Sequence, residues 1–252
     1  MDLGLKGKVA IVTGGAKGIG GAVSECLAQE GANLVVCYRS EPERCEAFIE
    51  DLRQRYGVTC VGVQGDLSSM ETVMRIYDEA ERAFGTIDIL VNNAGGAKTT
   101  AIVDVSLEEW EQALGSNVTG MMYMSREFAK RLIAQGKGGR IVNVLSKVAM
   151  SATSKNRVCY ITNKTAELGL TRQLALDLVE HEIIVNGVLP GLVITDINRN
   201  MPNLPDKIKR MPRKRPIQPT EIADTVAYLA SNRAESMVAS IVDCSGGLLL
   251  GL

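Results

Sequence analysis

Residues 8–20 read KVAIVTGGAKGIG, and this stretch decides the fold. The apolar run 8–13 is typical of a buried strand, and a helical pattern follows near 18–30. A glycine-rich turn between a strand and a helix lets the backbone approach a pyrophosphate, whose charge is favoured at the helix N-terminus. Taken alone, the pattern also fits a tight strand-to-helix turn that binds nothing, so the rest of the chain has to decide.

Strand-like apolar runs alternate with helical patterns along the rest of the chain. Further strands are expected at 33–38, 59–64, 87–92, 140–145, 183–188 and 240–244, and helices near 42–56, 69–84, 107–115, 117–136, 158–180 and 220–231. This alternation predicts a parallel sheet covered by helices on both faces. Without a linker or an internal repeat, residues 1–252 are interpreted as a single doubly wound α/β domain of about seven strands. Its ligands are expected at the carboxyl ends of the strands.

The composition excludes several classes of protein. Hydrophobic residues make up 46% of the chain, charged residues 23%, and the net charge of −1 gives no preference for nucleic acid. No apolar run approaches the length of a membrane span, and the N-terminal apolar stretch continues into glycines rather than a signal-peptide cleavage site. One histidine and six scattered cysteines give no metal-ligand spacing. A cytoplasmic protein without a bound metal is therefore expected.

Three motifs occur together and in order: TGxxxGxG (13–20), NNAG (92–95) and YxxxK (160–164). On these motifs the chain resembles the short-chain dehydrogenase/reductase family, and the resemblance covers the whole chain. It implies a Rossmann fold and a nicotinamide cofactor, with hydride exchange between a carbonyl and an alcohol. It also implies a homotetramer, which is common among family members.

The residues after the second strand bear on the choice of cofactor. Tyr38 falls where relatives that prefer NAD usually carry an aspartate, and Arg39 follows at once. An arginine at this place accommodates the 2′-phosphate of NADP, and its guanidinium matches phosphate oxygens bidentately. Lys17 in the glycine turn would add a second positive charge. Solvated surface cations are the alternative, but two cations without an acid favour NADP(H).

The resemblance implies further cofactor contacts after other strands. Asp66 would bind the adenine amine, although a helix N-cap is the alternative role, and Ser68 or Ser69 would serve as that cap instead. In the segment 190–195, the backbone of Val193 would hold the carboxamide of the nicotinamide. The implied cofactor-binding residues are Gly14, Lys17, Gly18, Ile19, Gly20, Tyr38, Arg39, Ser40, Asp66, Leu67, Asn93, Ala94, Gly95, Tyr160, Lys164, Pro190, Gly191, Val193 and Thr195. Asn92 is interpreted as mainly structural.

Tyr160 is a poor acid and a worse base by itself, because the unperturbed pKa of tyrosine is about 10. Residues i and i+4 of a helix share a face, so Lys164 can point into the same cleft. A nearby ammonium stabilises phenolate and brings the tyrosine proton within working range of neutral pH. The resemblance adds Ser146, which would hydrogen-bond the substrate carbonyl, and Asn117, which would help to hold a water in a proton relay. The implied catalytic residues are Asn117, Ser146, Tyr160 and Lys164.

The chain departs from the family pattern at three points around these residues. The spacing from Ser146 to Tyr160 is slightly longer than the commonest one. Leu145 replaces a small residue, and Asn163 stands where serine or alanine usually precedes the lysine. These departures remove no reacting group, but they can reshape the pocket. Cys159 is interpreted as a packing residue, because nothing in the sequence activates its thiol.

The irregular segment 196–216 corresponds to the substrate lid of the family. Its cations are Arg199, Lys207, Lys209, Arg210, Arg213, Lys214 and Arg215, and its acids are Asp196 and Asp206. Such a cluster would attract an anion, although a solvated, mobile lid is the alternative. With its apolar neighbours, the lid suggests an apolar ketone or secondary alcohol that carries negative charge. A hydroxysteroid or bile acid fits this description, and so does a 3-oxoacyl thioester on an acidic carrier protein.

The sequence is also compatible with other functions. One is a regulatory protein that binds NADP(H) without turnover, although such proteins usually lose the tyrosine or the lysine, and Tyr160 and Lys164 are both present. Another is a polyol or sugar dehydrogenase. A nucleic-acid protein that uses the basic lid has little support, because the chain as a whole is not basic.

Overall fold

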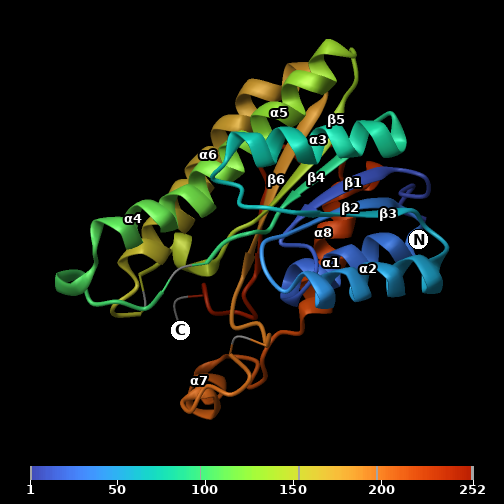
Figure 1. Cartoon of the computed structure of the whole chain (residues 1–252). Helices are drawn as coiled ribbons and strands as arrows, with labels where there is room; N and C mark the ends of the chain where they lie inside the picture. The colour runs from blue at the N-terminus through green and yellow to red at the C-terminus, as the bar shows by residue number, and fades with distance from the viewer. Residues whose placement is uncertain (1, 97, 153, 197, 251–252) are drawn as a thin grey trace.

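The computed structural model describes residues 2–96, 98–152, 154–196 and 198–250. At its centre lies a seven-stranded sheet in the order β3-β2-β1-β4-β5-β6-β7, and every neighbouring pair is parallel (Figure 1). The strands are β1 (Val9–Thr13), β2 (Asn33–Tyr38), β3 (Cys60–Gln64), β4 (Ile89–Asn92), β5 (Gly139–Val144), β6 (Ile183–Pro190) and β7 (Ile241–Cys244). The predicted doubly wound α/β fold is confirmed. The strand order reverses between β1 and β4, which is where such sheets bind ligands.

Helices cover both faces of the sheet. One layer contains α1 (Gly18–Gln29), α2 (Pro42–Tyr56) and α8 (Pro219–Ala230), and the other contains α3 (Met70–Phe84), α5 (Gly120–Ala134) and α6 (Val158–Leu178) (Figure 1). Two further helices, α4 (Leu107–Leu114) and α7 (Leu204–Arg210), extend beyond these layers. Short 3₁₀ turns occupy Ile102–Asp104, Lys147–Ala149, Val179–His181 and Asn232–Ala234. Among the described residues, no helix combines the length and the apolar character that crossing a membrane requires.

The strand β1 explains why the central strands are mainly apolar. All five of its residues are buried. Ala10 and Val12 belong to the apolar cluster beneath α1, α2 and α8, whereas Ile11 belongs to the cluster beneath α3 and α5. Successive strand residues point to opposite faces, and both faces are covered here, so a polar residue at any of these positions would be buried.

Two segments differ from the sequence-based expectation. The predicted interruption between the helices near 107–115 and 117–136 is a π turn, Gly115–Thr119, so α4 and α5 run on from one another without a loop. A π turn holds an extra residue in a helix, and periodicity alone does not reveal it. The irregular stretch 191–218 contains the short helix α7, which was not predicted because its residues are mainly charged and show no apolar stripe.

Candidate active site

The glycine turn follows β1 at the point where the strand order reverses. Gly14 and Gly18 have φ of 61° and 58°, a backbone region that glycine adopts without strain. A Cβ atom on Gly20 would lie 2.2 Å from the backbone oxygen of Gly14, so no larger residue fits position 20. The turn therefore leaves its backbone open to a ligand beside the N-terminus of α1, as a pyrophosphate requires.

Hydrogen bonds fasten this turn to the end of β4. The Thr13 hydroxyl accepts from the backbone N–H of Asn93 at 2.9 Å and from that of Ala94 at 3.0 Å. The Asn93 side-chain amide donates to the carbonyl oxygens of Thr13 and Gly14 at 3.0 and 3.2 Å. Asn93 and Ala94 thus shape the glycine turn as well as the segment beside it.

The segment after β6 reaches the same turn from the other side. A Cβ atom on Gly18 would lie 3.4 Å from Cγ2 of Thr195, so these two predicted cofactor residues are neighbours. Asn198 holds the segment in shape, because its side-chain oxygen accepts from the backbone N–H of Thr195 and its amide donates to the carbonyl of Val193 at 2.7 Å. Asn198 was not among the residues predicted from the sequence. The sequence feature that could have identified it is a short polar side chain three residues after Thr195, since such side chains often hydrogen-bond the nearby backbone.

A chain of charged side chains lies at the outer end of the glycine turn. The Lys17 ammonium pairs with Glu41 at 2.7 Å, and the Arg44 guanidinium bridges Glu41 at 3.0 Å and Asp196 at 2.5 Å. Arg39 lies 3.7 Å from Asp66 and is largely exposed. Glu41 and Arg44 were not predicted as site residues. Both lie at the start of the helix that follows β2, and this position is the feature of the sequence that could have identified them. The structure thus places three cations and three carboxylates at this end.

Asp66 does not cap the helix that follows it. Ser69 is the N-cap of α3, since its hydroxyl accepts from the backbone N–H of Thr72. The carboxylate of Asp66 accepts instead from the backbone N–H and the hydroxyl of Ser68 at 2.9 and 2.8 Å. These bonds to Ser68, mainly the backbone one, lower the pKa of Asp66 despite its partial burial. Asp66 is therefore held as a charged acceptor at the carboxyl end of β3.

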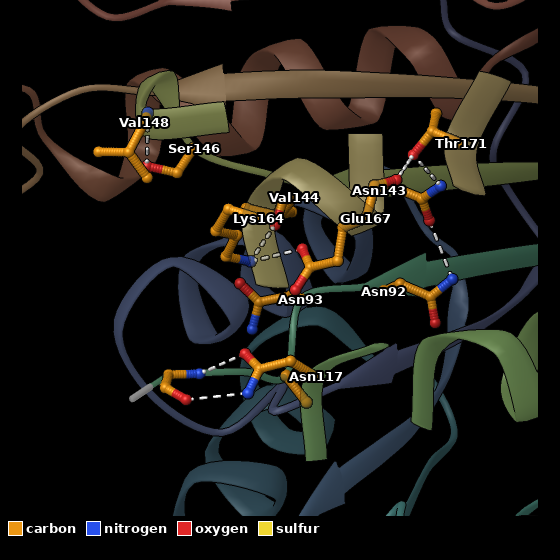
Figure 2. Close-up of polar contacts among 12 residues, drawn as sticks. Asn92, Asn93, Asn117, Asn143, Val144, Ser146, Val148, Lys164, Glu167 and Thr171 are labelled. Atoms are coloured by element: carbon orange, nitrogen blue, oxygen red, sulfur yellow. Dashed lines mark hydrogen bonds and ion pairs between the residues drawn. The ribbon is translucent and has the colours of Figure 1, made fainter. Parts of the chain in front are cut away.

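Lys164 is buried on α6, whereas Tyr160, one turn earlier, is partly exposed. The Lys164 ammonium donates to the carbonyl of Val144 at 3.0 Å and to the carboxylate of Glu167 at 2.7 Å (Figure 2). Burial alone would lower the pKa of Lys164, but the attraction of Glu167 and of Tyr160 outweighs it, so the pKa is raised. Lys164 is thus held in its charged form within electrostatic reach of Tyr160.

Asn117 lies in the π turn and is buried. Its side-chain oxygen accepts from the backbone N–H of Gly96 at 2.8 Å, and its amide donates to the carbonyls of Gly96 at 2.9 Å and Ala113 at 2.6 Å (Figure 2). A Cβ atom on Gly95 would lie 2.6 Å from the Asn117 side-chain oxygen and 3.7 Å from the Lys164 nitrogen. The NNAG segment, the π turn and α6 therefore meet at one place.

Ser146 lies two residues after the end of β5 and is buried, and its hydroxyl accepts from the backbone N–H of Val148 at 3.4 Å. Within the described ranges, the side chains of Ser146, Asn117, Tyr160 and Lys164 make no hydrogen bond to one another. Backbone groups hold three of them, as described above. The position of each group is therefore set by the sheet and the helices, and not by hydrogen bonds among the four side chains.

Arg157 was not predicted as a site residue, yet it covers Tyr160. Its guanidinium carbon lies 4.6 Å from the centroid of the Tyr160 ring, and one nitrogen donates to the Thr99 hydroxyl at 3.2 Å. A cation over a tyrosine face is attracted by the ring, so Arg157 helps to hold the Tyr160 side chain in place. The sequence signal is a basic residue three positions before the tyrosine, at the N-cap of α6. Cys159 is buried, and mainly this burial raises the pKa of its thiol.

The predicted lid, 196–216, is anchored to α8. Glu221 accepts from Arg215 at 2.7 Å and from Arg213 at 3.3 Å. These partners, Arg215 first, lower the pKa of Glu221 to about 2. Met211 is buried in the core cluster below. The two arginines are therefore engaged within the chain rather than free to attract an anion.

Comparisons with known proteins bear on this arrangement. A family model described as Enoyl-(Acyl carrier protein) reductase matches residues 14–249. The chain is 34% identical to the 3-oxoacyl-[acyl-carrier-protein] reductase FabG of Aquifex aeolicus, over 98% of this chain and 100% of that protein. The L-sorbose reductase of Gluconobacter frateurii, solved in complex with NADPH and L-sorbose, superposes with a TM-score of 0.93 at 30% identity and full coverage of both chains. A short chain dehydrogenase of Burkholderia cenocepacia, solved with NADP, gives a TM-score of 0.90 at 31% identity, covering 96% of this chain and 98% of that one.

Proposed function

Because the chain belongs to the short-chain dehydrogenase/reductase family, a family of oxidoreductases acting on carbonyl and alcohol groups, we propose that it is an NADP(H)-dependent carbonyl reductase or alcohol dehydrogenase. The observation that carries the proposal is the position of Tyr160 and Lys164. They lie one turn apart on α6, and the Lys164 ammonium reaches Gly95 and the end of β5 at Val144, at the carboxyl ends of the strands. Family membership and this placement together favour turnover over a regulatory protein that only binds the cofactor.

The residues present fit a dinucleotide. The turn 13–20 offers open backbone at a helix N-terminus, and a side chain on Gly20 would collide with the backbone of Gly14. Lys17, Arg39 and Arg44 gather where a 2′-phosphate would bind. A phosphate carries more negative charge than Glu41, so it competes for Lys17 and Arg44 on favourable terms. This supports NADP(H) over NAD(H), as do the NADPH and NADP in the two structures compared above.

In the proposed reduction, bound NADPH would supply the hydride to the carbonyl carbon. Tyr160 donates the proton to the carbonyl oxygen, and the Ser146 hydroxyl hydrogen-bonds the same oxygen. The Lys164 ammonium stabilises the phenolate left behind and would also hold the ribose of the nicotinamide. Asn117 positions the backbone around Gly96, beside which a water of the proton relay would sit. In this way the chain supplies positioning and proton delivery.

For the substrate, we propose an apolar ketone or secondary alcohol, with 3-oxoacyl thioesters and hydroxysteroids as the first candidates. Thr100 pairs with Arg157, which covers Tyr160, so the segment after Thr100 borders the catalytic helix. Exposed apolar side chains follow there and after the turn at Ser146, namely Ile102, Val103, Leu107 and Met150. Such a rim suits an acyl chain or a steroid better than a sugar. An anionic group on the substrate gains less support, because the lid arginines are engaged with Glu221.

A sugar or polyol dehydrogenase is the second candidate. The L-sorbose reductase superposes over the full length of both chains, and this likeness is the observation that favours it. The polar lining that a sugar requires would have to come from Arg157, Thr99 and their neighbours. Both candidates use the same four catalytic residues, so only substrate trials separate them.

The test is nicotinamide absorbance in one matched panel. It runs 3-oxoacyl thioesters, L-sorbose and small ketones with NADPH, and hydroxysteroids, bile acids and polyols with NADP⁺, each repeated with the non-phosphorylated cofactor. Tyr160→Phe serves as the control, since it should abolish turnover and keep NADPH binding. Turnover of one class names the substrate family. Silence of the whole panel with NADPH still bound would contradict the proposed activity and favour the regulator.

Two further expectations come from the sequence: the assembly from the family resemblance, and the location from the six scattered cysteines. We propose a homotetramer and a cytoplasmic location. Light scattering after size exclusion tests the assembly, and fractionation of cells tests the location.

A further inference from the structure

Glu167 lies one helical turn after Lys164 and is buried with it. Their side chains are 4% and 6% exposed, and the carboxylate oxygen lies 2.7 Å from the ammonium nitrogen (Figure 2). The other carboxylate oxygen of Glu167 is buried and has no hydrogen-bond partner among the described residues. Glu167 is therefore committed to Lys164 rather than shared between several groups.

The backbone of Glu167 is also held from the other side. Its carbonyl accepts from the Thr171 hydroxyl at 2.7 Å, and that hydroxyl accepts from the Asn143 amide at 3.0 Å. Asn143 in turn accepts from the Asn92 amide at 2.9 Å (Figure 2). A polar chain thus runs from β4 through β5 to α6 and ends at the turn that carries Glu167. This series of hydrogen bonds fixes the position of Glu167 along α6 relative to the carboxyl ends of the strands.

Stability alone does not account for this carboxylate. Burying two charges costs solvation, and an apolar pair of the same volume is often as stable or more so. An ammonium has three donor hydrogens, and Lys164 uses two of them on Val144 and Glu167. One hydrogen is left, and the two bonds determine the direction in which it points. The pair is therefore suited to aiming the ammonium.

We propose that Glu167 is a positioning residue for the reaction, which aims the Lys164 ammonium and keeps the proton on it, and thereby sets the upper pH limit of carbonyl reduction. This inference rests on the proposed function. Removing a negative charge weakens the hold of nearby groups on their protons, so the loss of Glu167 moves that limit to lower pH.

The charges around the pair are few. Within the described part of the chain, the titratable groups that act on Lys164 are Glu167 and Tyr160, and the one that acts on Glu167 is Lys164. From β5 the pair meets an uncharged carbonyl, that of Val144. Burial raises the pKa of Glu167, and the ammonium only partly opposes this. Among the residues that the structure describes, no other charged side chain replaces Glu167 if it is removed.

Two variants and a matched control test the proposal. Glu167→Gln keeps the size and a hydrogen-bond acceptor but loses the charge, and Glu167→Leu loses both. The control is Glu127→Gln, since Glu127 is an equally buried carboxylate that pairs with Arg126 and Lys130 on α5, away from the site. Circular dichroism establishes that each variant is folded. If Glu167→Leu does not fold, the pH profile and the NADPH affinity of Glu167→Gln alone test the proposal.

The readouts are kcat and KM between pH 6 and pH 10 and the fluorescence-measured affinity for NADPH at pH 7 and pH 9. For Glu167→Gln, we expect the alkaline limb of kcat to move down by about one to three pH units. The NADPH affinity should fall roughly three- to tenfold in Glu167→Leu, because the ammonium is no longer aimed at the ribose. Glu127→Gln should match the unmodified protein in both measurements.

A pH profile and an NADPH affinity that stay unchanged in both Glu167 variants would overturn the proposal. The same holds if Glu127→Gln shifts the profile equally, since the effect would then be one of general charge. If the unmodified protein turns over no substrate, the proposed function fails instead. The NADPH titrations then still decide the role of Glu167, because they require no turnover.

Discussion

Replacing Glu167 by leucine should cost more stability than replacing both members of its ion pair. The two side chains are almost completely buried, and their charged atoms lie 2.7 Å apart. Removing one partner of a buried pair destabilises a protein by about 3–5 kcal/mol, because the other charge stays buried without compensation. Glu167→Leu leaves the ammonium with the Val144 carbonyl as its remaining partner, so a loss in that range is expected.

The double variant, Lys164→Met with Glu167→Leu, buries no charge at this place. Its free energy of unfolding should lie within about 1 kcal/mol of that of the unmodified protein or above it, since apolar replacements of buried pairs are often neutral or stabilising. Lys164→Met alone should be destabilised at pH 7 and less so at pH 5. The pKa of the buried Glu167 is already raised, so its carboxyl takes up a proton in the folded state as the pH falls.

The assay is equilibrium unfolding in urea without cofactor, followed by circular dichroism and by the fluorescence of Trp110. One protein concentration is used throughout, because any assembly makes stability depend on concentration. Losses that simply add in the double variant would refute the reasoning, since coupled partners must show a large interaction energy. A loss of less than about 1 kcal/mol for Glu167→Leu would refute it too, because it would mean that water reaches the pair.

Other consequences are open to direct measurement. Gly20→Ala should abolish NADPH binding while the protein still folds, because its Cβ atom would lie 2.2 Å from the Gly14 oxygen; a fluorescence titration with NADPH checks this, and binding at full affinity would contradict the tight turn. Arg44→Ala should weaken NADPH binding roughly tenfold and leave NADH unaffected, since a charged hydrogen bond contributes about 1.5–3 kcal/mol; equal losses for both cofactors would place Arg44 elsewhere than at the 2′-phosphate. The pKa of Glu221 is lowered to about 2 by Arg215 and its neighbours, so the anchoring of the lid should be complete above about pH 4.5 and be lost as the pH falls toward 2. Hydrogen exchange of 204–216 measures this, and exchange that stays slow throughout that window would show that Glu221 is not the anchor.

The sequence predicted what local chemistry determines. The glycines at 14, 18 and 20 are required by backbone conformation and close approach, so their spacing alone located the turn at the end of β1. The alternating apolar runs predicted the layers, because a strand covered on both faces is mainly apolar. Tyr160 and Lys164 were predicted to share a face by helical spacing.

Residues whose role depends on a partner were not predicted. Glu167 is an ordinary acid in a helix until the fold buries it against Lys164. Arg157 becomes notable only when the helix places it over the Tyr160 ring. Glu41 and Arg44 matter because Lys17 and Asp196, distant in sequence, come to the same place. Such pairs follow from tertiary packing, which neither composition nor periodicity records.

The π turn at Gly115–Thr119 makes this stretch sensitive to chain length. Deleting one of its residues would let α4 and α5 join as a regular α-helix, which is locally the more stable conformation. Yet each residue of a helix turns the chain by about 100°, so the same deletion would rotate α4 away from its place and pull Asn117 off Gly96. An insertion would rotate it in the opposite sense. A library of single-residue deletions and insertions should therefore leave active proteins around the loops, and none between residues 115 and 119.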